Sequence, residues 1–185
     1  MVSVTALLLP ILISAVAAFV VSSVIHMAVQ YHKNDYRKLP NEDAVMNALR
    51  EQQIPPGEYM FPRADSMQHM KSPEMVARFE SGPIGVMVLM TSGHCSIGKP
   101  LALWFVFCVV ISLLTAYVTG LALPQGAAAM QVFRIASAAA FIGHGMSSIQ
   151  NSIWKGVPWS TAWKYVFDGL LYALATGAVF AWLWP

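Results

Sequence analysis

Three ionisable side chains fall inside apolar segments of this sequence, where a charge is costly. His26 lies in an apolar run near the start of the chain, and His144 and Asp168 lie in two later runs. A charged group near the middle of a bilayer costs at least ~2.5–3.5 kcal/mol, so it must find a partner inside a helix bundle. At 1.5 Å per helical residue, all three lie roughly 8–12 Å from the same membrane face. We expect Asp168 to pair with His144, with His26 nearby.

Helical spacing places further polar residues on the same faces, because residues three or four positions apart share one side of a helix. Tyr165 and Tyr172 lie on the Asp168 face, and their hydroxyls are further candidates for this polar layer. The face of His144 carries a packing or channel stripe made of Arg134, Ser137, Ser148 and Asn151. Two earlier stripes consist of Ser22, His26 and Gln30, and of Cys108, Ser112, Thr115 and Thr119.

Several kinds of chemistry suit such a layer. A proton relay or a small-solute path uses these residue types, and a buried hydrogen-bonded pair that fixes helix register is the structural alternative. His26 and His144 are also the only two intramembrane histidines in a position to ligate haem. A metal site that includes Asp168 is a further alternative. We nevertheless expect no metal or other cofactor, and the absence of an H-E-x-x-H motif disfavours a metalloprotease.

Composition indicates a membrane protein. The 185 residues are 57% hydrophobic and 11% charged, whereas soluble domains carry about 25% charged residues. Sixteen of the twenty charged side chains lie between residues 32 and 100, as eight basic and eight acidic residues. This distribution excludes an ordinary soluble globule, and a net charge of +2 disfavours a nucleic-acid partner. The expected partners are the lipid bilayer and either a second copy of the chain or a larger membrane complex.

Four segments are long and apolar enough to cross a bilayer as helices, which takes about 20 residues. The third is the weakest, because it contains Arg134. A cleaved signal peptide is the alternative for the first, but no Lys or Arg precedes it and it is too long for a signal core, so we favour an uncleaved helix. The four expected spans are Val4–Tyr31, Leu101–Leu123, Met130–Ile149 and Trp159–Trp184.

Basic residues predict the orientation of these spans. Lys33 follows the first span, Lys99 precedes the second, and Lys155 and Lys164 flank the turn between the last two. Under the positive-inside rule, residues 32–100 are cytoplasmic and both termini lie on the opposite side of a bacterial inner membrane. The six tryptophans lie near span ends, as in an aromatic belt.

Capping and turn residues divide the segment between the first two spans into short elements. Asn41 is placed to cap a helix over residues 42–52, and Ser72 followed by proline is typical of a second helix start. Extended pieces near residues 58–61 and 84–90 have strand length, and the second either pairs with the first or lies against the membrane surface. The segment therefore predicts a small α/β cap.

A phosphate-binding motif is only partly present. Residues 93–99 fit the spacing G-x-x-x-x-G-K, but Pro100 stands where a Ser or Thr would hold Mg²⁺. We interpret this stretch as a glycine-rich turn at the membrane boundary. Cys95 and Cys108 form no C-x-x-C motif and are expected to be free thiols.

Several stretches together resemble small multi-pass bacterial inner-membrane proteins known only as hypothetical proteins. They are residues 32–40, 71–75, 152–160 and 182–185. The resemblance extends over most of the chain and implies a membrane location, but it implies no activity, cofactor or catalytic residue.

We therefore predict an all-α membrane protein with four transmembrane helices in a bundle. Residues 1–31 form the first helix, residues 32–100 form the cytoplasmic α/β cap, and residues 101–185 form helices two to four. The expected function is that of a non-enzymatic accessory or scaffold subunit. The alternative is a small transporter, channel or proton-relay unit that uses the intramembrane His/Asp layer.

Overall fold

The computed structural model describes residues 1–94 and 96–185 and divides the chain into two compact units. The first unit contains residues 1–35, 96–152 and 157–185, and the second contains residues 36–94 and 153–156. Residues 32–35, which the sequence analysis assigned to the cap, thus belong to the helical unit. They do so because His32 and Asp35 form hydrogen bonds with side chains of the last helix.

The helical unit begins with one continuous helical segment in three parts. A 3-10 turn, η1 (Val4–Leu7), leads into α1 (Leu8–Ser23), which ends in the π-helical η2 (Val24–Val29). The later helices are α5 (Gly98–Ala122), α6 (Ala129–His144), α7 (Ser148–Lys155) and α8 (Trp159–Trp182).

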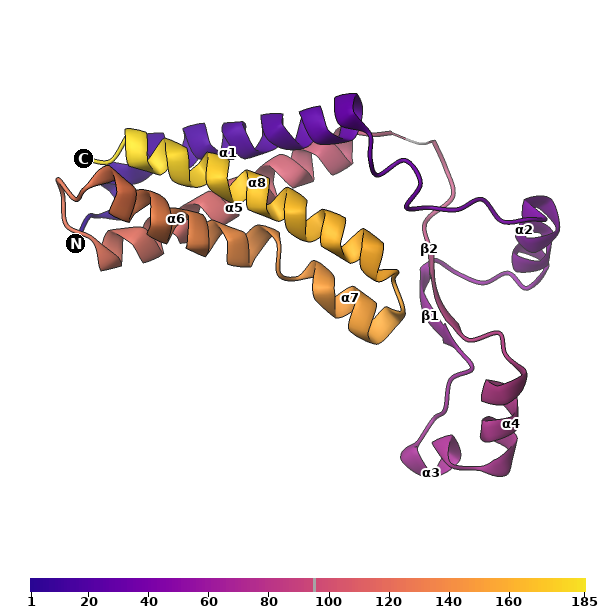
Figure 1. The fold of residues 1–185 in the computed structure, drawn as a ribbon. Helices are drawn as coiled ribbons and strands as arrows, with labels where there is room; N and C mark the ends of the chain where they lie inside the picture. The colour runs from indigo at the N-terminus through magenta and orange to yellow at the C-terminus, as the bar shows by residue number, and fades with distance from the viewer. Residues whose placement is uncertain (95) are drawn as a thin grey trace. The chain divides into compact units, whose positions relative to one another are not determined.

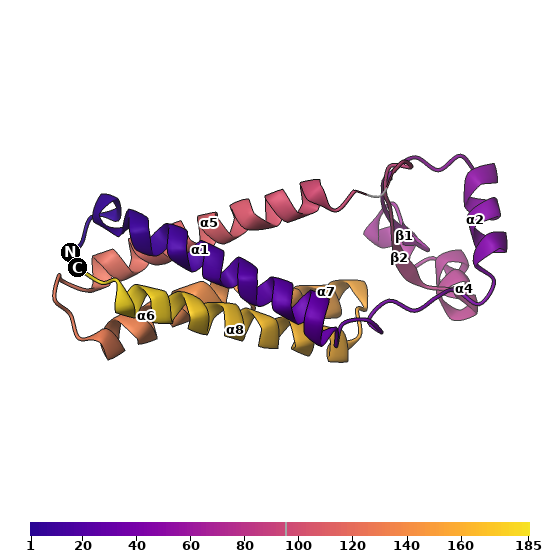
Figure 2. The same ribbon diagram turned by 90° about the horizontal axis from the view of Figure 1, so that it is seen from above.

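Helices α1, α5, α6 and α8 run alongside one another as a bundle in which each contacts two neighbours (Figures 1 and 2). Both chain ends lie at the same end of this bundle, since the Val2 amide donates to the Gly120 carbonyl and the Gly126 amide donates to the Pro185 carbonyl. The chain therefore traverses the length of the bundle four times.

Three helices of the described chain are long and apolar enough to cross a membrane: Val4–Val29, Gly98–Ala122 and Trp159–Trp182. These correspond to the first, second and fourth expected spans. The third expected span, Met130–Ile149, is not one continuous helix, because α6 ends at His144 and a turn separates it from α7. With 16 residues, α6 is shorter than the roughly 20 that a bilayer core requires. The count of four spans is thus not confirmed.

Small and hydroxyl side chains fill the interior of the bundle. Ala15, Ala116, Ala136 and Ala173 are fully buried, which allows the helix backbones to approach closely. The expected polar stripe on α5 faces inward, with Cys108, Ser112, Thr115 and Thr119 buried. The polar face of α5 thus points into the bundle.

Ser112→Ala removes one of these interior contacts, in which the Ser14 hydroxyl donates to Ser112 Oγ over 3.0 Å. We expect the free energy of unfolding to fall by about 0.6 kcal/mol, the average value of such bonds in membrane bundles. Unfolding in mixed detergent micelles measures it. Ser23→Ala is the control, since that hydroxyl bonds within its own helix, to the Phe19 carbonyl. Equal losses in the two variants would contradict the prediction.

The second unit matches the predicted α/β cap in its elements. Strand β1 pairs with β2 in antiparallel register, with Tyr59 opposite Met87. The Ser72 hydroxyl accepts from the Met75 amide at the start of α4, as predicted, whereas the Asn41 side chain makes no capping hydrogen bond within the described part of the chain. The elements are α2 (Glu42–Glu51), β1 (Gly57–Phe61), α3 (Met67–Met70), α4 (Pro73–Ser81) and β2 (Gly85–Leu89).

Gly98 and Lys99, the last two residues of the glycine-rich stretch, lie in the first turn of α5. Of the two cysteines, Cys108 is a buried free thiol, as expected, and the prediction for Cys95 lies outside the described residues.

Candidate functional site

The end of the first helical segment positions two histidines. His26 lies within the π-helical η2, and its side chain is 40% exposed. Gln30 then adopts a left-handed conformation with φ 54°, and its amide donates to the Ile25 carbonyl over 2.9 Å. This reversal directs the following residues back to the bundle, so that His32 reaches α8. π-Helical turns occur frequently at functional sites.

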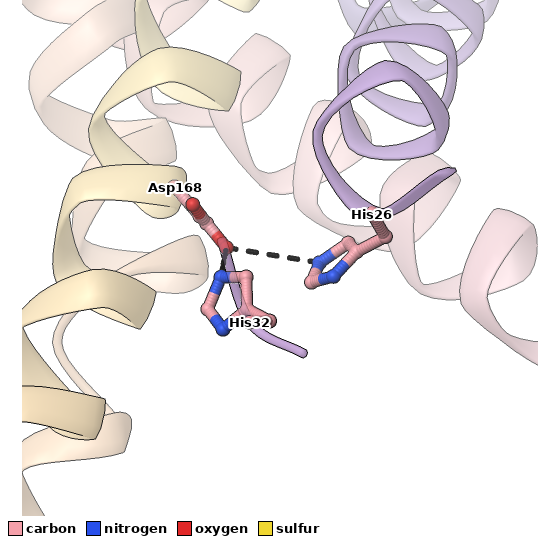
Figure 3. A group of neighbouring side chains, drawn as sticks. All are labelled: His26, His32 and Asp168. Carbon is pink, nitrogen blue, oxygen red and sulfur yellow. Dashed lines mark hydrogen bonds and ion pairs between the residues drawn. The ribbon is translucent and has the colours of Figure 1, made fainter. Parts of the chain in front are cut away.

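Asp168 is the buried centre of the cluster (Figure 3). It lies on α8 and is 1% exposed. Its Oδ2 atom forms a 2.8 Å hydrogen bond with His32 Nε2 and lies 3.7 Å from His26 Nε2. Its second oxygen, Oδ1, is buried without a hydrogen-bond partner among the described residues. Two imidazoles thus face one oxygen of the Asp168 carboxylate, and its other oxygen is available to a further ligand.

Asp35 and Lys164 support His32 from its other side. His32 Nδ1 lies 2.6 Å from Asp35 Oδ2, and Lys164 donates to Asp35 Oδ1 and, over 2.9 Å, to the Tyr31 carbonyl. Burial of the Asp35 side chain, which is 3% exposed, favours the neutral acid. Hydrogen bonds from Lys164 and His32, together with the positive charge of Lys164, outweigh burial and hold the pKa of Asp35 below its ordinary value.

Aromatic rings border the His32 imidazole. The ring centroids of Tyr31 and Tyr165 lie 4.5 Å and 4.9 Å from it, and that of His26 lies 4.7 Å away. Tyr165 therefore belongs to the neighbourhood of the cluster through its contact with His32. These ring contacts and the two carboxylate partners of His32 together restrict the orientation of its imidazole.

The predicted pairing of Asp168 with His144 is wrong, because His32 is the hydrogen-bond partner of Asp168. Both ring nitrogens of His144 are buried without a partner among the described residues. Its imidazole lies edge-on to the rings of Trp104, Phe107 and Tyr172, at centroid distances of 6.1 Å, 5.8 Å and 5.6 Å. His144 and Tyr172 thus form an aromatic contact beside the site. Haem ligation by His26 and His144 stays a prediction.

The stripe predicted on the third span does not form one continuous interior surface. Ser137 has a buried hydroxyl, and Ser148 donates to the Gly145 carbonyl over 2.9 Å at the start of α7. Arg134 and Asn151 are exposed. The turn after His144 separates the two halves of the stripe.

The cluster has the composition of an ion site. One ligand atom from each of His26, His32 and Asp168 lies within 4.8 Å of the others. With neutral histidines, the two carboxylates of Asp35 and Asp168 and the ammonium of Lys164 sum to one negative charge. A poorly solvated site of this charge attracts a cation. The sequence analysis named His26 and Asp168 and missed His32.

Comparisons with known proteins give no independent indication of function: no family model, no curated protein and no solved structure matches the chain.

Proposed function

We propose that this protein is a small ion-transfer unit of the membrane, in which His26, His32 and Asp168 form the ion site. The buried carboxylate of Asp168 carries the proposal, since it lies inside a helix apolar enough to span a membrane and faces two imidazoles. Ionisable residues inside spanning helices mark ion pathways in transporters and pumps. This is the transporter, channel or proton-relay alternative of the sequence analysis.

The proposed topology has four membrane crossings, with α6 as the short third span. The four passes of the chain along the bundle support it. The positive-inside rule then places residues 32–100 in the cytoplasm and both termini on the opposite side, in a bacterial inner membrane. Four helices leave a narrow path, so the proposed assembly is a second copy of the chain or a larger membrane complex.

A role as accessory or scaffold subunit is the second candidate. It is favoured by the second unit, which exposes apolar side chains that a partner protein could cover. Met60, Met67 and Met90 are 54%, 73% and 85% exposed, and Val88 is 63% exposed. Exposed methionines adapt to varied partner surfaces.

Ion influx into lipid vesicles tests the proposed function. We expect purified full-length protein in vesicles loaded with a pH indicator or a zinc indicator to accelerate influx of one of the two ions at least tenfold. Asp168→Asn should return influx to the rate of empty vesicles. Asp65→Asn, which changes an 83% exposed carboxylate of the second unit, should not.

A second variant keeps this test informative if Asp168→Asn fails to fold. His26→Ala changes a side chain that is already 40% exposed and should reduce influx with the fold intact. If wild-type protein transfers neither ion faster than empty vesicles, the ion-transfer proposal is wrong and the accessory role is favoured.

A further inference from the structure

The His32 ring lies between two carboxylates, and each of its ring nitrogens faces one of them. Nδ1 lies 2.6 Å from Asp35 Oδ2 and Nε2 lies 2.8 Å from Asp168 Oδ2. A neutral imidazole carries one N–H, so it can donate to only one of the two. If Nδ1–H donates to Asp35, the Nε2 lone pair faces the Asp168 carboxylate. Nε2 and the carboxylate oxygen are both electron-pair donors and repel each other. A cation that both atoms bind replaces this repulsion with two attractive contacts.

We infer that this cation is a divalent transition-metal ion of the zinc class, held by His26, His32 and Asp168. This inference rests on the proposed function, because it names the ion that the site takes. Two imidazole nitrogens and a carboxylate oxygen are ligands of Zn²⁺ and of its neighbours in the first transition row. Ca²⁺ and Mg²⁺ instead prefer oxygen ligands, and Cu⁺ prefers sulfur.

The distances suit a tetrahedral ion. With bonds of about 2.0–2.1 Å, ligand atoms around Zn²⁺ lie about 3.3 Å apart. The separations of Asp168 Oδ2 from His32 Nε2 and from His26 Nε2, 2.8 Å and 3.7 Å, lie on either side of that value. The third separation, between ring nitrogens of the two histidines, is within 4.8 Å, so side-chain rotations that bring the two rings closer together complete a three-ligand site. Solvent near the 40% exposed His26 side chain supplies the fourth position.

Asp35 is the positioning residue of this site. A metal-binding histidine usually donates its other N–H to a carboxylate, which fixes the tautomer and orientation of its ring. Asp35 occupies that position at His32, and Lys164 in turn holds Asp35. A hydrogen-bonded network alone would need no third ligand. His26 Nε2 lies 3.7 Å from the same carboxylate oxygen, beyond hydrogen-bond distance, and so adds a third ligand atom to those of His32 and Asp168.

Metal binding to the full-length protein in detergent tests this inference. We expect calorimetry to show one Zn²⁺ per chain, and Co²⁺ to give the visible absorption bands of a four-coordinate site. His26→Ala and His32→Ala should each weaken Zn²⁺ binding at least tenfold. Asp35→Asn should weaken it 10–100-fold, the usual effect of losing such a positioning carboxylate, with the Co²⁺ bands shifted. His94→Ala, which changes an exposed histidine of the second unit, is the matched control.

The outcomes separate this inference from the proposed function. Absence of a saturable Zn²⁺ site, or equal affinity in wild type, His26→Ala and His32→Ala, overturns the metal assignment. If protons still enter vesicles through wild-type protein and not through Asp168→Asn, the ion-transfer proposal stands without it. Zinc binding with no ion influx contradicts ion transfer and leaves a metal site that only binds.

Discussion

Replacing Gly169 with leucine is expected to lower the free energy of unfolding of the helix bundle by about 3 kcal/mol, the upper end of the usual cost of overpacking. A Cβ atom at residue 169 would lie 2.4 Å from the Cα atom and 2.6 Å from the nitrogen of Gly145. Both are backbone atoms of the α6 end, so no side-chain rotation relieves the clash. Helices α6 and α8 must therefore separate, although they form the most extensive helix contact of the unit.

Unfolding in mixed detergent micelles, followed by circular dichroism, measures this loss. Ala178→Leu is the matched control, because it adds a similar side chain to the exposed face of the same helix. Gly169 also adjoins Asp168, so separation of the helices should weaken Zn²⁺ binding as well. Equal stability of Gly169→Leu and Ala178→Leu would show that α6 and α8 do not pack at Gly145.

Asp35→Ala is expected to cost about 2 kcal/mol of unfolding free energy, within the range for hydrogen bonds to charged groups. The change leaves Lys164 and His32 without their shared carboxylate. The Lys164 side chain is 31% exposed, so water compensates part of the loss. This keeps the cost below the roughly 3–5 kcal/mol of breaking a fully buried ion pair.

A double-mutant cycle isolates the Asp35–Lys164 interaction. With Lys164→Met as the second change, the coupling energy should be about 1 kcal/mol or more, since the groups share one network. Asp65→Ala is the control, because its ion pair with His69 is 3.8 Å long and exposed, and such pairs contribute about 0–1 kcal/mol. A coupling energy near zero would mean that Asp35 does not hold Lys164 in the folded protein.

Local signals in the sequence predicted the elements of the second unit well. Ser72 and the proline after it mark the start of α4 because capping depends on neighbouring backbone groups alone. The two strands were likewise predicted near their observed bounds, and the pairing that was one of two alternatives is the one that forms. The helix start and the strand bounds follow from such local signals, whereas the choice between the two alternatives for the second strand depends on a contact between segments far apart in the chain.

The site was predictable only in part. Helical spacing and depth were enough to place His26 and Asp168 in one layer. The position of His32 depends on the left-handed conformation of Gln30, and glutamine gives no signal for that conformation, unlike glycine or asparagine. His144 instead lies among rings from α5 and α8. Which neighbour meets a given helix face is decided by packing, which spacing along one helix does not specify.

X-ray absorption at the zinc edge tests most directly whether His26, His32 and Asp168 act as one ion site. For the zinc-loaded full-length protein, we predict two imidazole nitrogens and at least one carboxylate oxygen at about 2.0–2.2 Å. His32→Ala should remove one imidazole from the zinc shell. A shell made only of oxygen atoms, or a spectrum that His32→Ala leaves unchanged, would contradict the account.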